Sequence, residues 1–379
     1  MKQTNNKRIF FWILKVFVIW RLALFGFAVL GQKLFLFKES FPYLYKLTPY
    51  GDPLLWSWAN FDGVHYLGIV YESYYAKFTQ AFFPLYPLII RFLDPIFRNF
   101  IVDGLFVSNF CALLALFVFY KLILLDYSEQ VAKRSLIFLL IFPTSFFLGS
   151  FYNESLFLVL ILSSFYFSRH KKWFLAGFFG IFASLTRFVG IVLIPSLLME
   201  VFLIKGNYRK KIIPLLLSLM PILGLLSYMY YLQSDMGDPL FFVHSQVAFN
   251  VSRTTEKIVL LYQVFYRYIK MLLVVDIHQW LYFSVVFEFI TGLLFLGLLI
   301  YGYIKKIRPS YLLFGIFSYL IPTFTGTLNS MPRYVLTIFP CFIALALIKN
   351  KWITAILSVL FVLIFGLSIM LFTRGYWVA

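Results

Sequence analysis

Acidic residues are scarce in this sequence. Its 379 residues hold 15 Asp and Glu against 33 Lys and Arg, and charged residues make up only 13% of the chain. A soluble domain of this length carries about twice that share of charge. Hydrophobic residues reach 62%, and the apolar runs repeatedly approach the roughly 20 residues needed to cross a bilayer. We therefore predict an all-α polytopic membrane protein.

Cysteine and nucleotide-binding motifs are also lacking. Cys111 and Cys341 both fall in apolar segments, which indicates neither a disulfide framework nor a metal site. His, Cys, Asp and Glu do not occur together at the spacing of metal ligands, so we expect no divalent metal and no cofactor. A P-loop and a Gly-rich nucleotide fingerprint are absent as well, which argues against ATP or a soluble nucleotide sugar as donor.

The formal charge of +18 is explained by membrane topology rather than by a nucleic-acid partner. Lys and Arg collect in cytoplasmic loops, and an N-terminus in the cytoplasm puts basic residues in every predicted inner loop. We expect eleven spans, at 10–31, 102–124, 133–149, 152–168, 173–187, 188–204, 212–232, 279–304, 311–327, 333–348 and 352–371. Together they form one integral-membrane domain over residues 1–379.

The large first loop, residues 32–101, then lies on the non-cytoplasmic side. Residues 84–97 hold three prolines, Arg91 and Asp94, so we predict a short helix there that does not cross the membrane. Residues 257–275 show aromatic and basic residues at near-helical spacing and predict a second interfacial helix. This topology gathers most of the polar residues near the membrane on the outer face.

Asp62 is the leading candidate for catalysis. In the run WSWANFDGVHYLGIV, residues 56–70, Asp62, His65 and Tyr66 would share one face of a helix. A carboxylate beside an imidazole is a reasonable general-base pair. Two alternatives remain open: Asp62 caps a helix that begins at Gly63, and His65 forms a structural hydrogen bond.

Glu154, Arg187 and Arg333 are candidates because charged side chains near a span tend to face a cavity or a partner. Arginine offers phosphate a planar pair of donors, so Arg187, Arg333 and the adjacent Tyr334 suggest a phosphate site. The alternatives are binding of lipid headgroups and pairing of an arginine with Glu154. A candidate base and arginines on the outer face suggest transfer from a lipid-linked phosphate donor.

Seven strings in this chain resemble the PIG-V family, that is GPI mannosyltransferase 2 and its prokaryotic relatives in the GT-C glycosyltransferase superfamily. In order they are WANFDGVHYLGIV (58–70), AFFPLYPLIIR (81–91), SFYNESLFL (150–158), AGFFGIFASLTRFVG (176–190), GDPLFFVHSQVAF (237–249), MPRYVLTIFP (331–340) and RGYWVA (374–379). Each string alone is weak, but seven in the same order are specific.

The resemblance implies a GT-C-type fold and an inverting transfer of mannose from a polyprenyl- or dolichyl-phosphate carrier. The family's essential loop acid falls on Asp62, with Phe61 where relatives often have Trp. Other family-like motif positions are His65, Tyr66, Glu154, Arg187, Gln246 and Arg333. Since the chain is compact and rich in Lys, Ile and Phe, we expect a bacterial plasma-membrane relative; a eukaryotic one would lie in the endoplasmic reticulum.

The sequence therefore predicts a membrane glycosyltransferase that moves a sugar from a polyprenyl-phosphate donor to a lipid-linked or cell-surface glycan, among membrane lipids. A transporter or flippase of lipid-linked sugars is a competing hypothesis, although transporters usually carry ionisable residues at the midplane and often show repeated halves. A non-catalytic assembly subunit with the same fold is a further alternative, against which the intact Asp62 argues.

Overall fold

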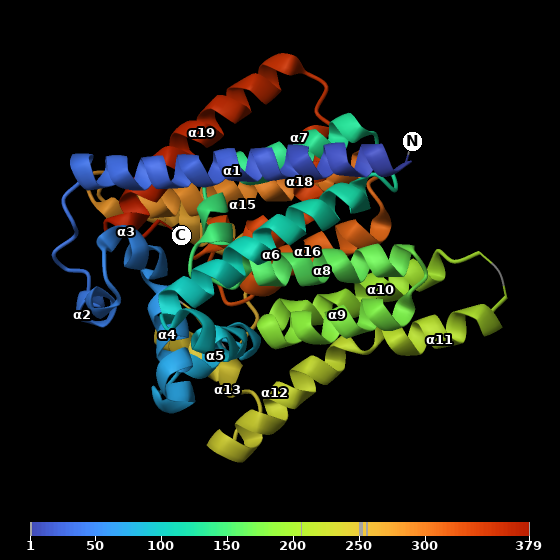
Figure 1. Cartoon of the computed structure of the whole chain (residues 1–379), viewed down its shortest axis with the longest axis horizontal. Helices are drawn as coiled ribbons and strands as arrows, with labels where there is room; N and C mark the ends of the chain where they lie inside the picture. The colour runs from blue at the N-terminus through green and yellow to red at the C-terminus, as the bar shows by residue number, and fades with distance from the viewer. Residues whose placement is uncertain (1, 206, 250–252, 255–256, 379) are drawn as a thin grey trace. The chain divides into compact units, whose positions relative to one another are not determined.

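The computed structural model describes residues 2–205, 207–249, 253–254 and 257–378, with side chains from residue 7 onward, and in these ranges it is built of helices (Figure 1). Met1 and Ala379, the ends of the predicted domain, lie outside the described residues, and so does the end of the RGYWVA string. Contacts divide the chain into two compact units. Unit 1 holds residues 1–73, 86–162 and 348–378, and unit 2 holds residues 74–85 and 163–347.

Unit 1 combines three long helices with a set of short ones in the first loop. α1 contacts both α19 and α6, and α7 contacts α6 and α19. The helices are α1 (Lys2–Leu34), α2 (Leu44–Leu47), α3 (Pro53–Trp56), α4 (Asp62–Glu72), α5 (Leu85–Phe97), α6 (Phe100–Ile123), α7 (Glu129–Ile141), α8 (Glu154–Arg169) and α19 (Lys351–Thr373). Leu85 and the second half of α8, from Ser163, belong to unit 2.

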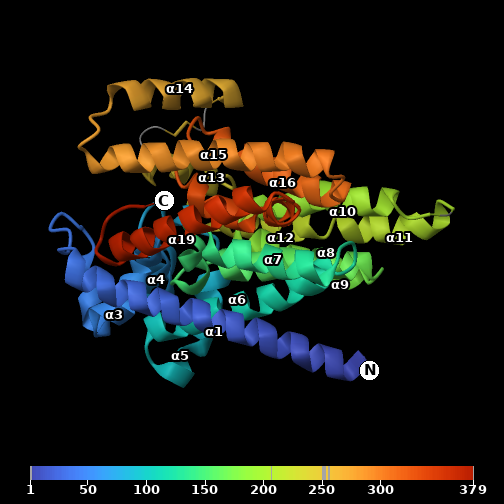
Figure 2. The same ribbon diagram turned by 90° about the horizontal axis from the view of Figure 1, so that it is seen from above.

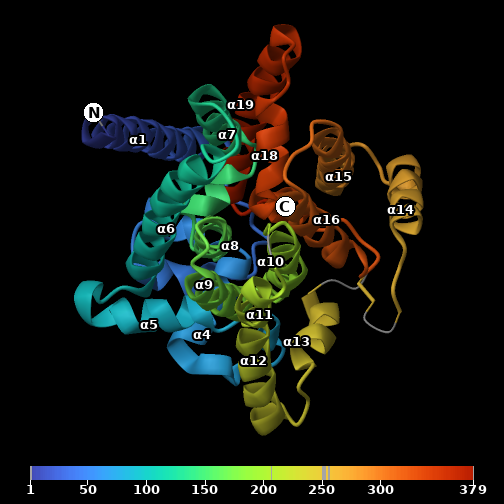
Figure 3. The same cartoon turned by 90° about the vertical axis from the view of Figure 1, so that its right-hand side faces the viewer.

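Unit 2 packs α9 against α11 and α12, which follow one another end to end in Figure 1 and lie next to α9 in Figure 3. It also packs α15 against α14, α16, α17 and α18. Figure 2 shows α14 running alongside α15. The helices are α9 (Trp173–Thr186), α10 (Leu193–Phe202), α11 (Arg209–Ser218), α12 (Pro221–Met236), α13 (Phe241–His244), α14 (Leu261–Val274), α15 (Trp280–Ile304), α16 (Pro309–Thr323), α17 (Met331–Tyr334) and α18 (Phe339–Ala346).

Five segments are long and apolar enough to cross a membrane: residues 7–34, 100–123, 209–236, 280–304 and 351–373. They coincide with five of the eleven predicted spans, which makes the chain a multi-pass membrane protein. The other six predicted spans fall on shorter helices, so a count of eleven spans is not shown. The predicted span at 133–149 is not one helix, because α7 ends at Ile141 where Phe142 turns to an extended backbone before Pro143.

Helices are present at both stretches that the sequence predicts to be interfacial, as α5 and α14. Each buries one face and exposes another: on α5, Tyr86 and Ile90 are buried, while Arg91 and Phe92 are exposed. On α14, Val264 and Tyr268 face inward, and Tyr262 and Tyr266 face outward. Their position relative to a membrane stays a prediction.

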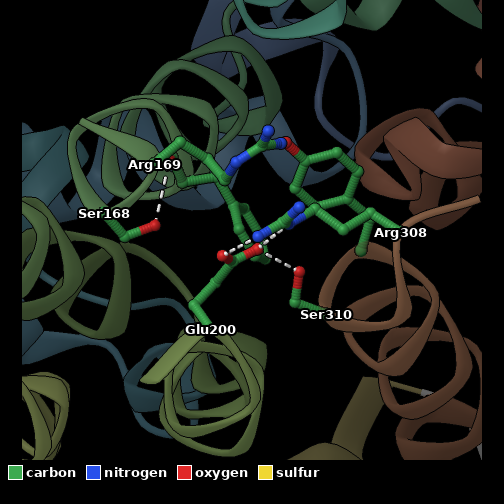
Figure 4. A network of polar contacts seen from close by, with 7 residues as sticks. Ser168, Arg169, Glu200, Arg308 and Ser310 are labelled. Atoms are coloured by element: carbon green, nitrogen blue, oxygen red, sulfur yellow. Dashed lines mark hydrogen bonds and ion pairs between the residues drawn. The ribbon is translucent and has the colours of Figure 1, made fainter. Parts of the chain in front are cut away.

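A buried ion pair ties α10 to the start of α16 within unit 2 (Figure 4). Arg308 donates from Nε and Nη2 to the two carboxylate oxygens of Glu200, at 2.5 and 2.6 Å. Ser310 donates its hydroxyl to Glu200 Oε1, and Arg169 donates to the Tyr311 hydroxyl at 2.6 Å. Glu200 is only 4% exposed, so this two-donor geometry compensates for burying its charge.

The predicted orientation can be tested with single cysteines at exposed positions, because the two native cysteines are buried. Ser73 and Asn207 are both exposed. We expect Ser73→Cys to react with a membrane-impermeant thiol reagent added to intact cells, whereas Asn207→Cys should react only after the cells are opened. Labelling in the reverse pattern would invert the topology.

Candidate active site

The turn before Asp62 is strained and firmly packed. Phe61 has φ +59° and ψ −117°, a conformation that costs a bulky residue on the order of 1–3 kcal/mol. Its ring lies 5.4 Å from Phe41 and 5.0 Å from Trp377, measured between centroids. The preceding Asn60 donates its side-chain amide to the Phe372 carbonyl at 2.8 Å. These contacts with distant parts of unit 1 hold the backbone in this shape.

Asp62 is the first residue of α4, so Asp62, His65 and Tyr66 share its first turn as the sequence predicts. Asp62 and His65 are half-buried, whereas Tyr66 is buried and packs edge-on against Tyr86. The cap position of α4 is Phe61, not Asp62. Asp52, by contrast, does cap a helix, since it accepts the backbone N–H of Leu54 at 2.7 Å.

His65 is held as a neutral imidazole near pH 7. Burial lowers its pKa below the usual value of about 6.5, the charge of Asp62 works in the opposite direction, and Lys46 lowers it further. The imidazole ring also stands edge-on to Tyr43, with 5.5 Å between centroids. A neutral His65 beside Asp62 can accept a proton or a hydrogen bond, which keeps both predicted roles available.

Two buried hydrogen bonds of Tyr152 support the turn before Asp62. Tyr152 donates its hydroxyl to the Asn60 carbonyl at 2.6 Å, and its own carbonyl accepts the hydroxyl of Ser108 on α6. A side chain at Gly63 would meet the Phe151 carbonyl at 3.3 Å, so α4 approaches this segment closely. Because each partner is buried and bonded, the turn is fixed rather than adjustable.

Glu154 begins α8 in the same unit and is 1% exposed. A carboxylate in the first helical turn is stabilised by the helix dipole. Tyr86, whose hydroxyl lies 2.8 Å from that of Ser108, has its pKa raised by burial, with Glu154 among the contributing charges. Unit 1 thus places Asp62, His65 and Tyr66 on one helical turn. Glu154 is connected to this turn through Tyr86, which contacts Tyr66, and through Tyr152, which bonds to Asn60.

Unit 2 gathers the remaining predicted residues around Tyr334. The guanidinium carbons of Arg187 and Arg333 lie 5.1 and 5.3 Å from the centroid of its ring. Arg187 stands in the break between α9 and the 3₁₀ turn Phe188–Val192, and Arg333 stands on α17. Arg333 is 5% exposed, while Arg187 and Tyr334 are half-buried. Gln246 is connected to Tyr334 through a third arginine, which bonds to both.

Arg253 is that arginine, and sequence reasoning missed it. It donates to Gln246 Oε1 at 2.6 Å and to the Tyr334 hydroxyl at 3.3 Å. Three guanidinium groups therefore converge on one tyrosine. We call Arg187, Arg253, Arg333 and Tyr334 the arginine cluster. The signal was present in the sequence, because the predicted topology puts residues on both sides of Arg253 on the outer face with Arg187 and Arg333.

The loop that carries Arg333 is anchored by a buried carboxylate. Glu288 on α15 accepts the Tyr268 hydroxyl at 2.5 Å and the backbone N–H of Ser330 at 3.1 Å. The Tyr268 hydroxyl in turn accepts the backbone N–H of Leu328 at 3.1 Å. Ser330 has φ +62°, which this bond helps to maintain. The positions of α17 and Arg333 therefore depend on Glu288.

Glu288 and Asp103 are two further acids that sequence reasoning passed over. Both are buried and lie within predicted spans, where an ionisable residue is a functional candidate by default. Among the described residues, neither carboxylate oxygen of Asp103 has a hydrogen-bond partner. Within the same ranges, no group of three or more His, Cys, Asp or Glu is placed to hold a metal ion.

No protein-family model matches the chain, and no curated protein matches it. Among solved structures it is similar to the oligosaccharyltransferase of Archaeoglobus fulgidus tethered to an acceptor peptide, with a TM-score of 0.49 and 12% identity over 97% of this chain and 55% of that chain. The same archaeal enzyme, AglB, with an inhibitory peptide and a dolichol-phosphate gives a TM-score of 0.47 and 12% identity over 96% and 56%.

The chain thus spans just over half the length of those structures. A likeness of this degree carries no argument about activity. The PIG-V family and the GT-C fold stay predictions.

The lowered pKa of His65 predicts a measurable acid sensitivity. As the pH falls below about 6.5, unfolded His65 takes up a proton before folded His65 does, so stability falls with pH. We expect the apparent unfolding temperature, at a fixed scan rate, to drop less between pH 7 and pH 5 for His65→Asn than for the wild type. His278→Asn, the same change at a highly exposed histidine, should follow the wild type. Identical pH dependence in all three proteins would contradict a buried neutral His65.

Proposed function

We propose that this protein is a membrane glycosyltransferase with a GT-C-type fold. It transfers a sugar, for which we propose mannose, with inversion from a polyprenyl- or dolichyl-phosphate carrier to a lipid-linked or cell-surface glycan. The observation that carries the proposal is the convergence of Arg187, Arg253 and Arg333 on Tyr334. The family resemblance of the sequence strings supports the same reaction class.

The arginine cluster has the properties of a phosphate site. Three guanidinium groups held around one tyrosine repel one another, and a bound phosphate anion relieves that repulsion, the more so as the leaving phosphate gains its second negative charge. Gln246, the bonded partner of Arg253, is neutral and leaves the positive charge in place. Glu288 attracts Arg253 electrostatically, but its oxygens accept from Tyr268 and Ser330. Arg333 is buried and Arg187 and Arg253 are half-buried, so their charge-assisted bonds to a phosphate would form in surroundings partly shielded from water.

Asp62 is assigned the proton transfer. As the acceptor hydroxyl attacks the anomeric carbon of the sugar, its proton passes to the Asp62 carboxylate. The bond between that carbon and the carrier's phosphate oxygen breaks, and the electron pair leaves with the phosphate. The arginine cluster stabilises the charge that develops on this leaving group. His65, neutral and one helical turn from Asp62, helps to orient the carboxylate or the acceptor.

This chemistry belongs on the non-cytoplasmic face of the plasma membrane in a bacterium. The basic inner loops support that orientation, and the lipid carrier delivers the sugar within the bilayer. Tyr66 and Glu154 are proposed to contact substrate near Asp62.

Asp62→Asn tests the proton acceptor, because it keeps the size of the side chain and removes its basicity. We expect the rate of sugar transfer to fall by about 10²–10⁴-fold, the range for loss of a general base. The assay supplies purified protein in lipid with radiolabelled polyprenyl-phosphate mannose and a membrane extract. Asp52→Asn is the matched control, since Asp52 lies in the same loop, is exposed, and only caps a helix that Asn also caps well.

Near wild-type transfer by Asp62→Asn would refute its role. If even the wild type transfers no label from any polyprenyl-phosphate sugar but still binds the donor, a flippase becomes the better description.

Arg253→Lys and Arg333→Lys test the phosphate site, because each keeps the charge and loses the two-donor fork. We expect the KM for the lipid-phosphate donor to rise about tenfold for each, the equivalent of one or two charge-assisted hydrogen bonds. Arg209→Lys, the same change at an exposed residue of unit 2, should leave it unchanged. Unaltered donor kinetics in both cluster variants would remove the phosphate assignment.

A further inference from the structure

A basic groove of about 530 Å³ lies within unit 1, between α7 and the start of α19. Arg134, Lys349 and Lys351 line its polar part, and Ile137 and Phe138 line its apolar part. No carboxylate is among its lining residues. The groove therefore combines three positive charges with an apolar wall. Its lining includes neither Asp62 nor any residue of the arginine cluster.

Arg134, Lys349 and Lys351 differ in the bonds that they already make within the protein. Arg134 donates from Nη2 to the Ile348 carbonyl at 3.0 Å, which fixes the turn before α19 against α7. Lys349 and Lys351 are exposed. The nearby Lys133 pairs with Glu129 at 2.6 Å and stands over the ring of Trp12, so the neighbouring acid is already matched by another lysine. In the part of the chain that the structure describes, Lys349 and Lys351 form no ion pair, so both can bind an external anion.

The groove lies at the basic end of unit 1. The start of α7 packs near the end of α6, and Trp12 of α1 contacts both, with its ring 6.4 Å from that of Tyr120 and 5.3 Å from the Lys133 ammonium. Along the chain, basic residues flank the start of α1, the end of α6, the start of α7 and the start of α19: Lys7, Arg8, Lys121, Lys133, Arg134, Lys349 and Lys351, against Asp126 and Glu129. Such an excess of basic residues beside spanning helices marks the cytoplasmic side of a membrane, whose leaflet carries anionic lipids.

The surface next to the groove suits acyl chains. Along α19, Ile356, Val359, Leu360 and Leu363 are exposed, on a helix apolar enough to span the membrane. A molecule with its phosphate among the lysines can therefore lay its hydrocarbon chains along α19. Thr354 and Ser358 also line the groove, but their hydroxyls donate to the helix backbone, so recognition rests on the cations.

We propose that this groove binds the phosphate headgroup of an anionic phospholipid of the cytoplasmic leaflet, with Lys349 and Lys351 as its principal contacts. The bound lipid ties α7 to α19 and so supports the helix whose far end holds Asn60 and Phe61. This site is independent of the proposed transfer reaction.

Native mass spectrometry of the full-length protein tests the proposal. The protein in detergent is titrated with dioleoyl phosphatidylglycerol or with dioleoyl phosphatidylcholine. We expect preferential retention of phosphatidylglycerol by the wild type. Lys349→Gln with Lys351→Gln should weaken that retention on the order of tenfold, because each lysine near an anionic headgroup contributes appreciably. Both residues are exposed, so the double variant should fold normally.

Lys205→Gln with Lys210→Gln is the matched control, since it removes the same charge from exposed positions in unit 2. This control should retain phosphatidylglycerol like the wild type. Equal losses in the two double variants would show attraction to overall charge and overturn the site. Equal retention of both lipids would overturn it too. Displacement of the lipid by millimolar inorganic phosphate would show a site for free phosphate and refute the lipid assignment.

Discussion

Backbone amides cannot be left unpaired in a bilayer, and this constraint governs the whole structure. Wherever the chain crosses apolar surroundings it must be helical, and several candidate site residues lie at the breaks between helices. The turn at Phe61, the break at Arg187 and the loop before Arg333 are such places. The first and the last of these are held by long-range hydrogen bonds, from Tyr152 to Asn60 and from Ser330 to Glu288. Candidate site residues and structural anchors therefore lie next to each other.

Periodicity and charge were enough to predict much of the fold. Helices α5 and α14, the first turn of α4 and five long apolar helices follow from apolar runs and from the spacing of aromatic and charged residues. The breaks inside apolar runs were harder to predict. The stretch 133–149 has the hydropathy of a span, yet Pro143 and the tertiary fit of residues 145–149 divide it. Local composition cannot report where a distant segment will supply the missing hydrogen bonds.

Among the candidate residues, too, single charges could be predicted from the sequence, whereas contacts between distant segments could not. Asp62, Arg187 and Arg333 stand out because charge is costly in an apolar chain. Arg253 lies in a polar loop where an arginine is unremarkable, and only the fold brings it to Tyr334. Glu288 was visible by the same rule that found Arg187, but its partners Tyr268 and Ser330 were not. The sequence thus identified individual charges, whereas their grouping and their anchors required the structure.

The strained turn at Phe61 also has a consequence for the order in which parts of the protein fold. Its strained backbone is held by Phe372 and Trp377 and by the bond from Asn60 to the Phe372 carbonyl, across 312 positions. Chains emerge and fold from the N-terminus, so these supports do not exist until α19 has been synthesised and inserted. Until then the turn relaxes to an unstrained shape and Asp62 is not held at the start of α4. The first loop is therefore synthesised early, but its turn at Phe61 reaches the final conformation only after α19 is in place.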